Sequence, residues 1–280
     1  MIGKKRMNKK YTKKEIMEMD YVDFLALLNE TNRPPGGKDS IRRMAINSFL
    51  TENSSVLHSG CNTGYCSFEI THLTKCKTTA IDINENMVDA SHKKLKKEPE
   101  VFRKKISFHV ADAHNLAFKD NSFDLVFSAG STAFMKNPSR VVCEHKRVCK
   151  PYGFVGDICI YYKKKAPVKL LNNINKLLKI EIKPWNKNYW VSLYQNEELE
   201  LYYDFTDNMP YHPNKKEVSE YCEKMVKNAF FNQPPKITEA AIEKLFGYMS
   251  LFNENHKYIA YSVLIFRKDV VKEQVTLFGK

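Results

Sequence analysis

The sequence predicts an α/β protein whose core is a doubly wound, mostly parallel sheet of seven strands. Three observations lead to this prediction. Apolar strand patterns alternate with helix patterns from residue 51 to residue 162, the turns between them are short, and a Gly-containing loop joins the first strand to its helix. Because parallel strands are joined by right-handed crossovers, such alternation places helices on both faces of the sheet.

The N-terminal region precedes this alternation. Residues 15–30 carry apolar side chains at helical spacing and predict a first helix. The segment NRPPGG at 32–37 ends it, because Pro and Gly interrupt helices. Residues 39–50 predict a second helix. We expect 15–50 to form an N-terminal helical cap and the basic residues 1–14 to form a flexible tail.

The core region, residues 51–162, supplies five of the seven strands. They are expected at 55–59, 78–83, 106–111, 123–129 and 154–162, the last of them after a turn at KPYG (150–153). Helices are expected at 85–97 and from Pro138 to about Cys149. Short apolar strands separated by such helices and turns are typical of a parallel sheet.

Beyond residue 162 the pattern changes, although 163–268 is assigned to the same domain. The segment APVKLLNNINKLLKI predicts a helix, and a short helix then precedes an aromatic strand at 199–205. Two helices, at 215–230 and 238–252, are inserted before a closing apolar strand at 258–268. We expect this helix pair to form a lid over the site, and residues 269–280 to form a tail.

The net charge of +13 points either to an anionic partner or to a solvated lysine surface. Lysines are scattered along the whole chain rather than confined to one stripe, which favours the second interpretation. No stretch approaches the length of about 18 apolar residues that a membrane span needs, so we expect no membrane partner. The basic tail lacks the apolar segment of a signal peptide.

Seven cysteines occur with loose spacing and without a C-x-x-C pair. This pattern argues against a disulfide framework and against a zinc site, so we expect no metal. Reduced thiols are typical of the cytoplasm, which is the location that we expect. The sequence indicates no oligomeric state.

The decapeptide VLHSGCNTGY ends the first strand and carries the first candidate site residues. Gly60 permits a tight turn, Asn62 tolerates a left-handed backbone, and Gly64 lets the backbone approach a ligand. Asp82 ends the second strand, where a carboxylate can accept both hydroxyl hydrogens of a ribose. Because the carboxyl ends of the strands meet at one edge of the sheet, these residues predict a nucleotide-type site there.

The later segments VADAHNLAFKDNSFDLVFSAG and EHKRVCKPYGFV extend this pattern. Together with the glycine loop and Asp82, they make residues 50–162 resemble the class I S-adenosylmethionine-dependent methyltransferases, specifically the small-molecule, type 11-like branch. The resemblance implies a Rossmann-like fold, S-adenosyl-L-methionine as the cofactor, and direct in-line methyl transfer to an acceptor.

The resemblance also implies a role for each matching residue of the first two loops. After the first strand, Gly60, Cys61, Asn62 and Gly64 would frame the methionine and ribose portion of the cofactor. After the second strand, Asp82 would hold the ribose hydroxyls.

The adenine and methionine ends are assigned in the same way. Ile83 would pack on the adenine, Asp112 would accept a hydrogen from its exocyclic amine, and the Ala113 amide would lie near a ring nitrogen. Ser128 and Gly130, after the fourth strand, would face the methionine end.

The segment LLNETNRPPGGKDS lies just before the core, where this family often places a segment that covers the cofactor. Asn32 and Arg33 are therefore candidate contacts for the carboxylate of the methionine moiety.

The chain departs from the family pattern at four positions: Asn62 and Tyr152 replace glycines, Ala117 replaces a proline, and His58 replaces an acid. Only His58 changes the chemistry, because a neutral imidazole offers one acceptor and no negative charge. His58 is a candidate cofactor-binding residue with two interpretations. In the first it packs and hydrogen-bonds beneath the turn. In the second the site is degenerate, and the protein binds the cofactor without catalysing a reaction. If the missing acid is a deficit, His58→Asp should bind the cofactor at least as well as the parent.

The segment after the fourth strand, SAGSTAF, narrows the choice of acceptor. It lacks the Asn/Asp-Pro-Pro-aromatic motif of enzymes that methylate DNA bases or glutamine, and it lacks the Pro-Cys nucleophile of cytosine carbon methylation. We expect a small-molecule acceptor, with an RNA methyltransferase, favoured by the charge, as the alternative. The identity of the acceptor and of its methylated atom stays open.

An aromatic cluster beyond the core predicts a wall that binds the acceptor. Its candidate substrate-binding residues are Tyr189, Tyr194 and Tyr203. His212, in the sequence YHP, is the candidate general base, although an unprotonated amine, a thiolate or a carboxylate acceptor would need none.

Overall fold

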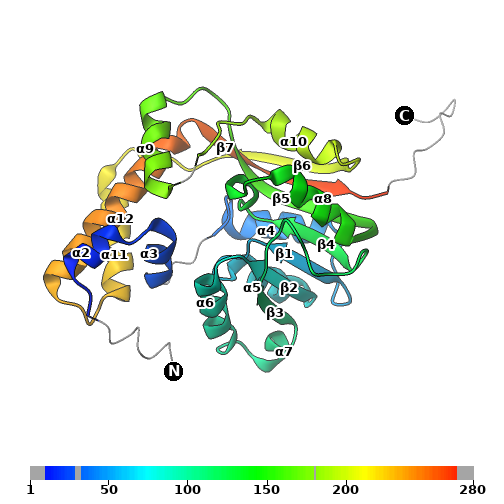
Figure 1. Cartoon of the computed structure of the whole chain (residues 1–280), viewed down its shortest axis with the longest axis horizontal. Helices are drawn as coiled ribbons and strands as arrows, with labels where there is room; N and C mark the ends of the chain where they lie inside the picture. The colour runs from blue at the N-terminus through cyan, green and yellow to red at the C-terminus, as the bar shows by residue number, and fades with distance from the viewer. Residues whose placement is uncertain (1–9, 29–32, 180, 270–280) are drawn as a thin grey trace.

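A seven-stranded sheet forms the core of the computed structural model, which describes residues 10–28, 33–179 and 181–269 (Figure 1). The strand order is β3-β2-β1-β4-β5-β7-β6, and β7 is antiparallel to both of its neighbours while the other pairs are parallel. The strands are β1 Ser55–Ser59, β2 Lys77–Asp82, β3 Ile106–Val110, β4 Phe123–Ser128, β5 Cys149–Tyr162, β6 Glu200–Asn208 and β7 Ile259–Arg267. The predicted doubly wound, mostly parallel sheet is confirmed.

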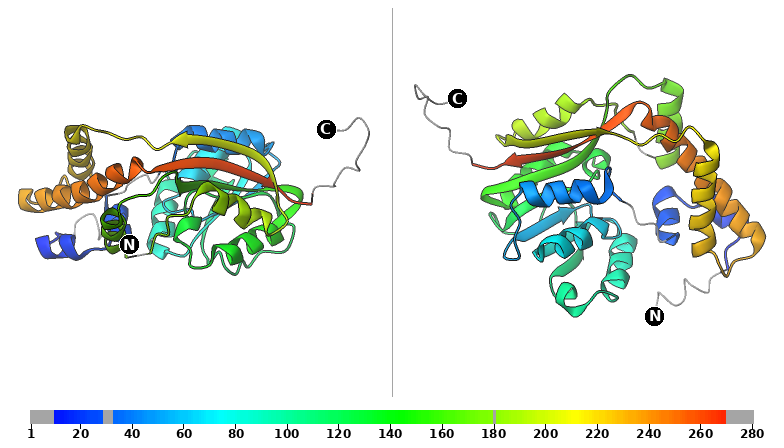
Figure 2. Two further views of the ribbon diagram at one scale, coloured as in Figure 1. Left: turned by 90° about the horizontal axis from the view of Figure 1, so that it is seen from above. Right: turned by 180° about the vertical axis from the view of Figure 1, so that it is seen from behind.

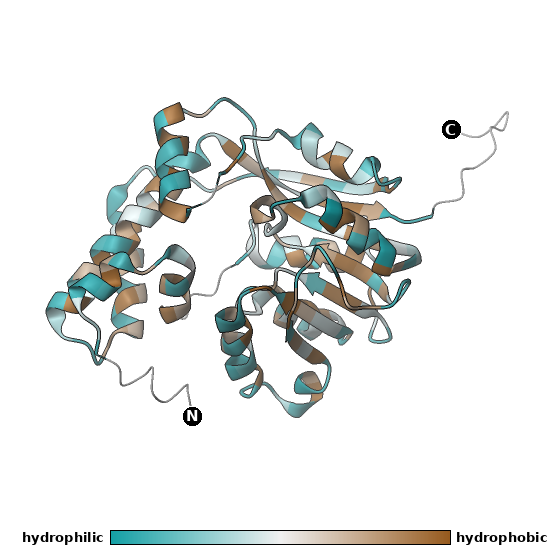
Figure 3. Ribbon diagram, viewed as in Figure 1, coloured by the Kyte–Doolittle hydropathy of each residue, from teal (hydrophilic) through white to brown (hydrophobic). Residues whose placement is uncertain are grey.

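Helices cover both faces of this sheet (Figure 2). On one face α4 and α5 pack against the strands through Ile41, Met44 and Ile70, and on the other face α8 and α10 contribute Val141 and Trp190. Apolar residues accordingly concentrate along the strands (Figure 3). The helices are α2 Lys13–Glu18, α3 Tyr21–Leu27, α4 Gly37–Asn47, α5 Tyr65–Thr74, α6 Glu85–Leu95, α7 Glu100–Arg103, the 3₁₀ helix η1 Thr132–Phe134, α8 Pro138–Val148, α9 Val168–Leu178, α10 Lys187–Gln195, α11 Lys215–Ala229 and α12 Pro235–His256.

The first predicted helix, 15–30, is wrong as a single element. The chain forms α2 and α3 there, separated at Met19, whose ψ of 136° is not helical. Asp20 then starts α3, because its side chain accepts the backbone N–H of Asp23 at 2.9 Å. A local cap therefore overrides the continuous apolar spacing.

The turn predicted at KPYG lies inside β5 and takes the form of a bulge. The pairing of β5 with β4 moves from Phe123 opposite Cys149 to Leu125 opposite Phe154, so the bulged strand carries extra residues. Tyr152 has φ of 60°, a left-handed conformation, and its side chain is exposed. The family pattern has glycine at position 152, and the backbone there has the left-handed conformation that glycine adopts most easily.

Tyr152→Gly is expected to raise the free energy of unfolding by about 0.5–1 kcal/mol, because it removes the strain of a left-handed tyrosine. Urea denaturation at neutral pH measures the change. Tyr211→Gly, at another exposed tyrosine with no positive φ, is the control and should not stabilise the chain. A lower stability for Tyr152→Gly would contradict the strain argument.

The first two helices of the predicted N-terminal cap and the two predicted lid helices form one helical lobe, defined here as α2, α3, α11 and α12, whereas α4 of the predicted cap packs on the sheet. They share a buried apolar core that includes Phe24, Val226 and Leu245. Nζ of Lys244 donates to the carbonyl oxygens of Ile16 and Met17 at 2.7 and 2.9 Å, which fixes the end of α2 on α12. Segments from the two ends of the sequence therefore support each other.

The helical lobe lies beside the sheet rather than on either of its faces (Figure 1). Nδ2 of Asn86, at the start of α6, donates to Oδ1 of Asp23 in α3 at 3.3 Å. This contact places α3 next to the end of β2. In the part of the chain that the structure describes, no helix has the length and apolar character that crossing a bilayer would require.

Candidate functional site

Four loops leave the carboxyl ends of β1, β2, β3 and β4, and we call them together the carboxyl-edge site: residues 60–64, 82–84, 112–114 and 128–131. The strand order reverses between β1 and β4, and ligands of open α/β sheets bind at such a switch point. The site is therefore built from segments that are distant in sequence.

The loop after β1 owes its shape to three left-handed residues. Gly60, Asn62 and Gly64 have φ of 70°, 49° and 86°. The backbone N–H of Cys61 donates to the carbonyl of Ile81 at 2.8 Å, and that of Gly64 donates to the carbonyl of Cys61 at 2.9 Å. Asn62 therefore adopts the conformation predicted for it, and the loop is held against the end of β2.

The loops after β1 and β4 are joined by the side chains of Ser128 and Ser131 and by the backbone carbonyl of Ser59. Oγ of Ser131 donates to the carbonyl of Ser59 at 3.0 Å and lies 2.7 Å from Oγ of Ser128. A Cβ atom at Gly60 would come within 2.1 Å of the Ser131 hydroxyl, so only glycine fits there. Ser128 was expected to face the methionine end, but its side chain is fully buried and braces the loop instead.

Asp82 connects the first two loops of the site. Its Oδ2 accepts the backbone N–H of Asn62 at 2.8 Å, and its Oδ1 accepts that of Asn84 at 2.9 Å. Burial raises the pKa of this carboxyl, while the backbone hydrogen bonds act in the opposite direction. Because each carboxylate oxygen can accept two hydrogens, both oxygens keep a lone pair for a ligand hydroxyl.

The predicted adenine contacts also lie at this edge. Ile83 directly follows β2 and is 72% exposed, unusual for so apolar a side chain. Asp112 lies after β3 and is half-exposed, and the side chain of Ala113 is buried beside it. Gly130, after β4, has φ of 90°.

His58 lies beneath the first loop rather than in it. The side chain is 1% exposed, stacks on Phe127 with ring centroids 4.4 Å apart, and has Nδ1 2.8 Å from Oγ of Ser67. Burial lowers the pKa of His58 to about 3, so the ring is neutral at physiological pH. These contacts support the interpretation in which His58 packs and hydrogen-bonds beneath the turn.

Arg33 lies near the start of α5. Its guanidinium carbon is 5.7 Å from the ring centroid of Tyr65, the residue that follows Gly64. The segment before the core therefore reaches the start of α5, and the contact of Arg33 with the cofactor stays a prediction. Asn32 lies outside the described residues.

The predicted aromatic wall does not form. Tyr194 is fully buried, donates to Oδ2 of Asp157 at 2.9 Å and stacks on Phe266, whereas Tyr189 stacks on Trp185. Both belong to α10 and its core.

Tyr203 is separated from these two tyrosines by the sheet. It is a residue of β6, and its hydroxyl accepts a hydrogen from Arg43 of α4, on the opposite face. The clustering of tyrosines in the sequence is therefore not a clustering in space, and Tyr189, Tyr194 and Tyr203 do not form a single wall.

His212 lies in the loop before α11. Its Nδ1 is 2.9 Å from Oε2 of Glu217, its backbone N–H donates to Asn253, and its side chain is 54% exposed. These contacts belong to the loop and the long helices of the lobe, not to the carboxyl-edge site, so the structure gives no support to His212 as a general base.

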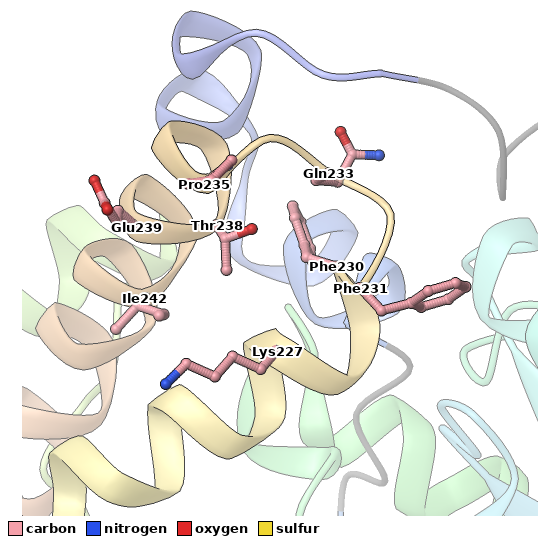
Figure 4. A pocket seen from close by; sticks show the side chains of 8 residues that line it. All are labelled: Lys227, Phe230, Phe231, Gln233, Pro235, Thr238, Glu239 and Ile242. Atoms are coloured by element: carbon pink, nitrogen blue, oxygen red, sulfur yellow. The ribbon is translucent and has the colours of Figure 1, made fainter.

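A surface groove of about 350 Å³ occurs at the turn between α11 and α12 (Figure 4). Phe230, Phe231 and Ile242 supply much of its apolar lining, and Lys227 and Glu239 lie along it. The groove belongs to the helical lobe, so we distinguish it from the carboxyl-edge site.

Sequence reasoning missed several residues that shape the site. Ser59 and Ser131 are neighbours only because β1 and β4 are adjacent, which the order of elements in the chain does not reveal. Asn84 was missed although an Asn two residues after a strand, directly before a helix, is a recognisable cap signal.

Comparison with known proteins shows which enzymes the chain is similar to. Residues 57–156 match the family model described as a methyltransferase domain. Over 113 residues, the chain is 32% identical to sterol 24-C-methyltransferase ERG6B of Gibberella zeae, a match that covers 40% of this chain and 29% of that enzyme. Residues 57–156 therefore carry a methyltransferase domain, and these matches support a class I S-adenosylmethionine-dependent methyltransferase.

Solved structures share the fold of this methyltransferase. The crystal structure of MccD protein has a TM-score of 0.72 and 24% identity, and the match covers 85% of this chain and 100% of that one. Phosphoethanolamine N-methyltransferase 2 of Haemonchus contortus, solved with S-adenosyl-L-methionine, has a TM-score of 0.68 and 16% identity, with 94% of this chain and 59% of that one covered. At sequence identities of 24% and 16%, the similarity of these two structures to the chain shows a shared fold alone.

Proposed function

We propose that this methyltransferase binds S-adenosyl-L-methionine at the carboxyl-edge site and transfers its methyl group to a small-molecule acceptor. The observation that carries the proposal is Asp82, which is fixed by Asn62 and Asn84 and keeps a lone pair on each oxygen. It lies on the edge at which nucleotide ligands of this fold bind. A diol such as the ribose of the cofactor matches these two acceptors.

The surrounding residues fit the rest of the cofactor. The exposed side chain of Ile83 offers an apolar surface to the adenine, and Asp112 offers an acceptor to its amine. Arg33, held near Tyr65, offers a positive charge to the carboxylate of the methionine part. The solved neighbour with bound S-adenosyl-L-methionine supports this assignment by analogy.

In this reaction the protein has to supply little covalent chemistry. The cofactor, when bound, supplies a methyl group that its positive sulfur has already activated for displacement. The chain aligns the reactants and excludes water from them. The Ser59–Ser131–Ser128 contacts keep the loops that flank the methionine end at a fixed separation, which such alignment requires.

The space for the acceptor is proposed to lie between the carboxyl-edge site and the helical lobe. Phe134, which follows Gly130 and Ser131 in the chain, is 55% exposed and offers an apolar contact there. The contact of Asn86 with Asp23 supports the placement of the lobe beside this edge. The name of the phosphoethanolamine enzyme, whose match extends over most of this chain, supports a small acceptor by analogy.

Methyl-labelled cofactor, incubated with the protein and a deproteinised metabolite extract, is expected to label the metabolite fraction. A parallel incubation with total cellular RNA is expected to leave the RNA unlabelled, because scattered lysines give only weak, salt-sensitive binding to phosphates. Asp82→Ala, at a cofactor concentration that does not saturate it, serves as the control with reduced labelling. Label in the RNA and none in the metabolites would replace the small-molecule proposal with the RNA alternative.

The second alternative, a cofactor-binding protein without catalysis, depended on the missing acid at position 58. The burial of His58 and its contacts with Phe127 and Ser67 give that residue a structural role. No other described feature favours a degenerate site, so we retain the enzymatic proposal.

A further inference from the structure

The carboxylate of Asp112 is held by one neighbouring residue, His114. Oδ1 of Asp112 accepts the backbone N–H of His114 at 2.9 Å and lies 2.6 Å from Nδ1 of its ring. These hydrogen bonds lower the pKa of Asp112, so it is ionised and can only accept hydrogens. Within the part of the chain that the structure describes, no donor reaches Oδ2, which is therefore available to a ligand.

The position of the ring hydrogen of His114 follows from its second nitrogen. Nε2 lies 3.3 Å from the backbone nitrogen of Asn137, and a backbone N–H can only donate. A neutral imidazole that accepts at Nε2 carries its hydrogen on Nδ1. Nδ1 of His114 is thus the donor to Asp112, and Asn137 fixes that arrangement.

Three hydrogen bonds tie the loop of His114 to α8 and its N-cap residue, Asn137. In addition to the Asn137 contact, Nε of Arg140 donates to the carbonyl of His114 at 3.0 Å. The backbone N–H of Leu116 donates to Oε2 of Glu144 at 2.8 Å. Asn137 lies at the end of the segment that follows β4, and this segment borders the proposed space for the acceptor. Through its contact with Asn137, His114 therefore connects the adenine end of the carboxyl-edge site with the acceptor end.

We propose that His114 is a positioning residue that presents Oδ2 of Asp112 to the exocyclic amine of adenine, and thereby selects an amino purine over an oxo purine. The inference rests on the proposed function, since it needs the cofactor at this edge. An amine donates to Oδ2, whereas a purine oxygen at the same place is a second acceptor facing a carboxylate. Without the imidazole, the half-exposed Asp112 keeps only the backbone N–H of residue 114 on Oδ1, and its preorganisation is weakened.

The test compares two ligands that differ only at the purine: S-adenosyl-L-homocysteine and S-inosyl-L-homocysteine. Calorimetric titrations use the full chain and the variants His114→Ala and His114→Asn. His109→Ala is the matched control, because His109 is an exposed histidine on β3, three residues before Asp112.

The parent is expected to prefer the adenosyl ligand. His114→Ala should weaken adenosyl binding roughly tenfold, the effect of one charged hydrogen bond, and inosyl binding by less than about twofold. His114→Asn keeps an N–H donor for Oδ1 and should recover most of the preference, while His109→Ala should match the parent.

The outcomes separate this inference from the function on which it rests. Equal losses for both ligands in His114→Ala, or no loss for either, would overturn the positioning role while leaving the cofactor assignment intact. A parent chain that binds neither ligand would overturn the proposed function, and the inference with it.

A spectroscopic readout tests the same geometry without a ligand. Long-range ¹H–¹⁵N correlation spectra of the parent should show the neutral His114 ring with its hydrogen on Nδ1, and Asp112→Ala should shift the population toward Nε2. A parent ring protonated on Nε2 would overturn the proposed network.

Discussion

Replacing Asp82 by alanine should weaken the binding of S-adenosylhomocysteine by about 1–3 kcal/mol, because charged hydrogen bonds to the ribose are lost. The variant also leaves the backbone N–H groups of Asn62 and Asn84 without their acceptor, so the loop after β1 loosens. Isothermal calorimetry on the full chain measures the difference.

Two further variants test whether the loss of affinity comes from the charge of Asp82. One keeps the shape of its side chain without the charge, and the other removes a different carboxylate nearby. Asp82→Asn keeps one acceptor oxygen and should lie between the parent and Asp82→Ala. Asp89→Ala removes an exposed carboxylate from α6, seven residues further on, and should bind as the parent does. Unchanged affinity in Asp82→Ala would contradict the placement of the ribose.

His58→Asp should lower the free energy of unfolding by about 3 kcal/mol or more at neutral pH. The new carboxylate would lie beside Phe127 in a buried space where His58 now has Ser67 as its one hydrogen-bond partner among the described residues. An uncompensated buried charge carries a penalty of this order. The sequence alone leads to a different expectation, in which His58→Asp would bind the cofactor at least as well as the parent.

The matched variant is His58→Asn, which has nearly the shape of aspartate without its charge. Urea denaturation should show His58→Asp to be less stable than His58→Asn at pH 7. Burial raises the pKa of an aspartate, so the difference should shrink as falling pH neutralises the carboxyl. If His58→Asp were as stable as the parent and bound S-adenosylhomocysteine more tightly, the missing acid would be a deficit after all.

Much of the core could be predicted because its signals are local. The strand from Ser55 to Ser59 is apolar over a short run, and the left-handed positions carry Gly60, Asn62 and Gly64, the residue types that favour such a backbone. Asp82 ends β2 and Asp112 follows β3, so the parallel sheet alone brings them to one edge. For these residues, local sequence and fold class contain the necessary information.

The failures concern contacts that local sequence does not determine. Tyr194 and Tyr203 are nine positions apart, yet α10 and α4 pack on opposite faces of the sheet, so their side chains face different partners. The burial of His58 depends on Phe127 of β4, which is adjacent only through the strand order. The shared core of the helical lobe likewise joins segments more than 190 residues apart in sequence, such as Phe24 and Val218.

The central claim is that the carboxyl-edge site binds S-adenosylmethionine, and calorimetric titration of the unaltered full chain tests it most directly. S-adenosyl-L-homocysteine is the stable probe, and NAD is the comparison ligand with the same adenosine part. We expect saturable one-to-one binding of S-adenosylhomocysteine and a clear preference for it over NAD. Absence of saturable binding, or a preference for NAD, would contradict the claim.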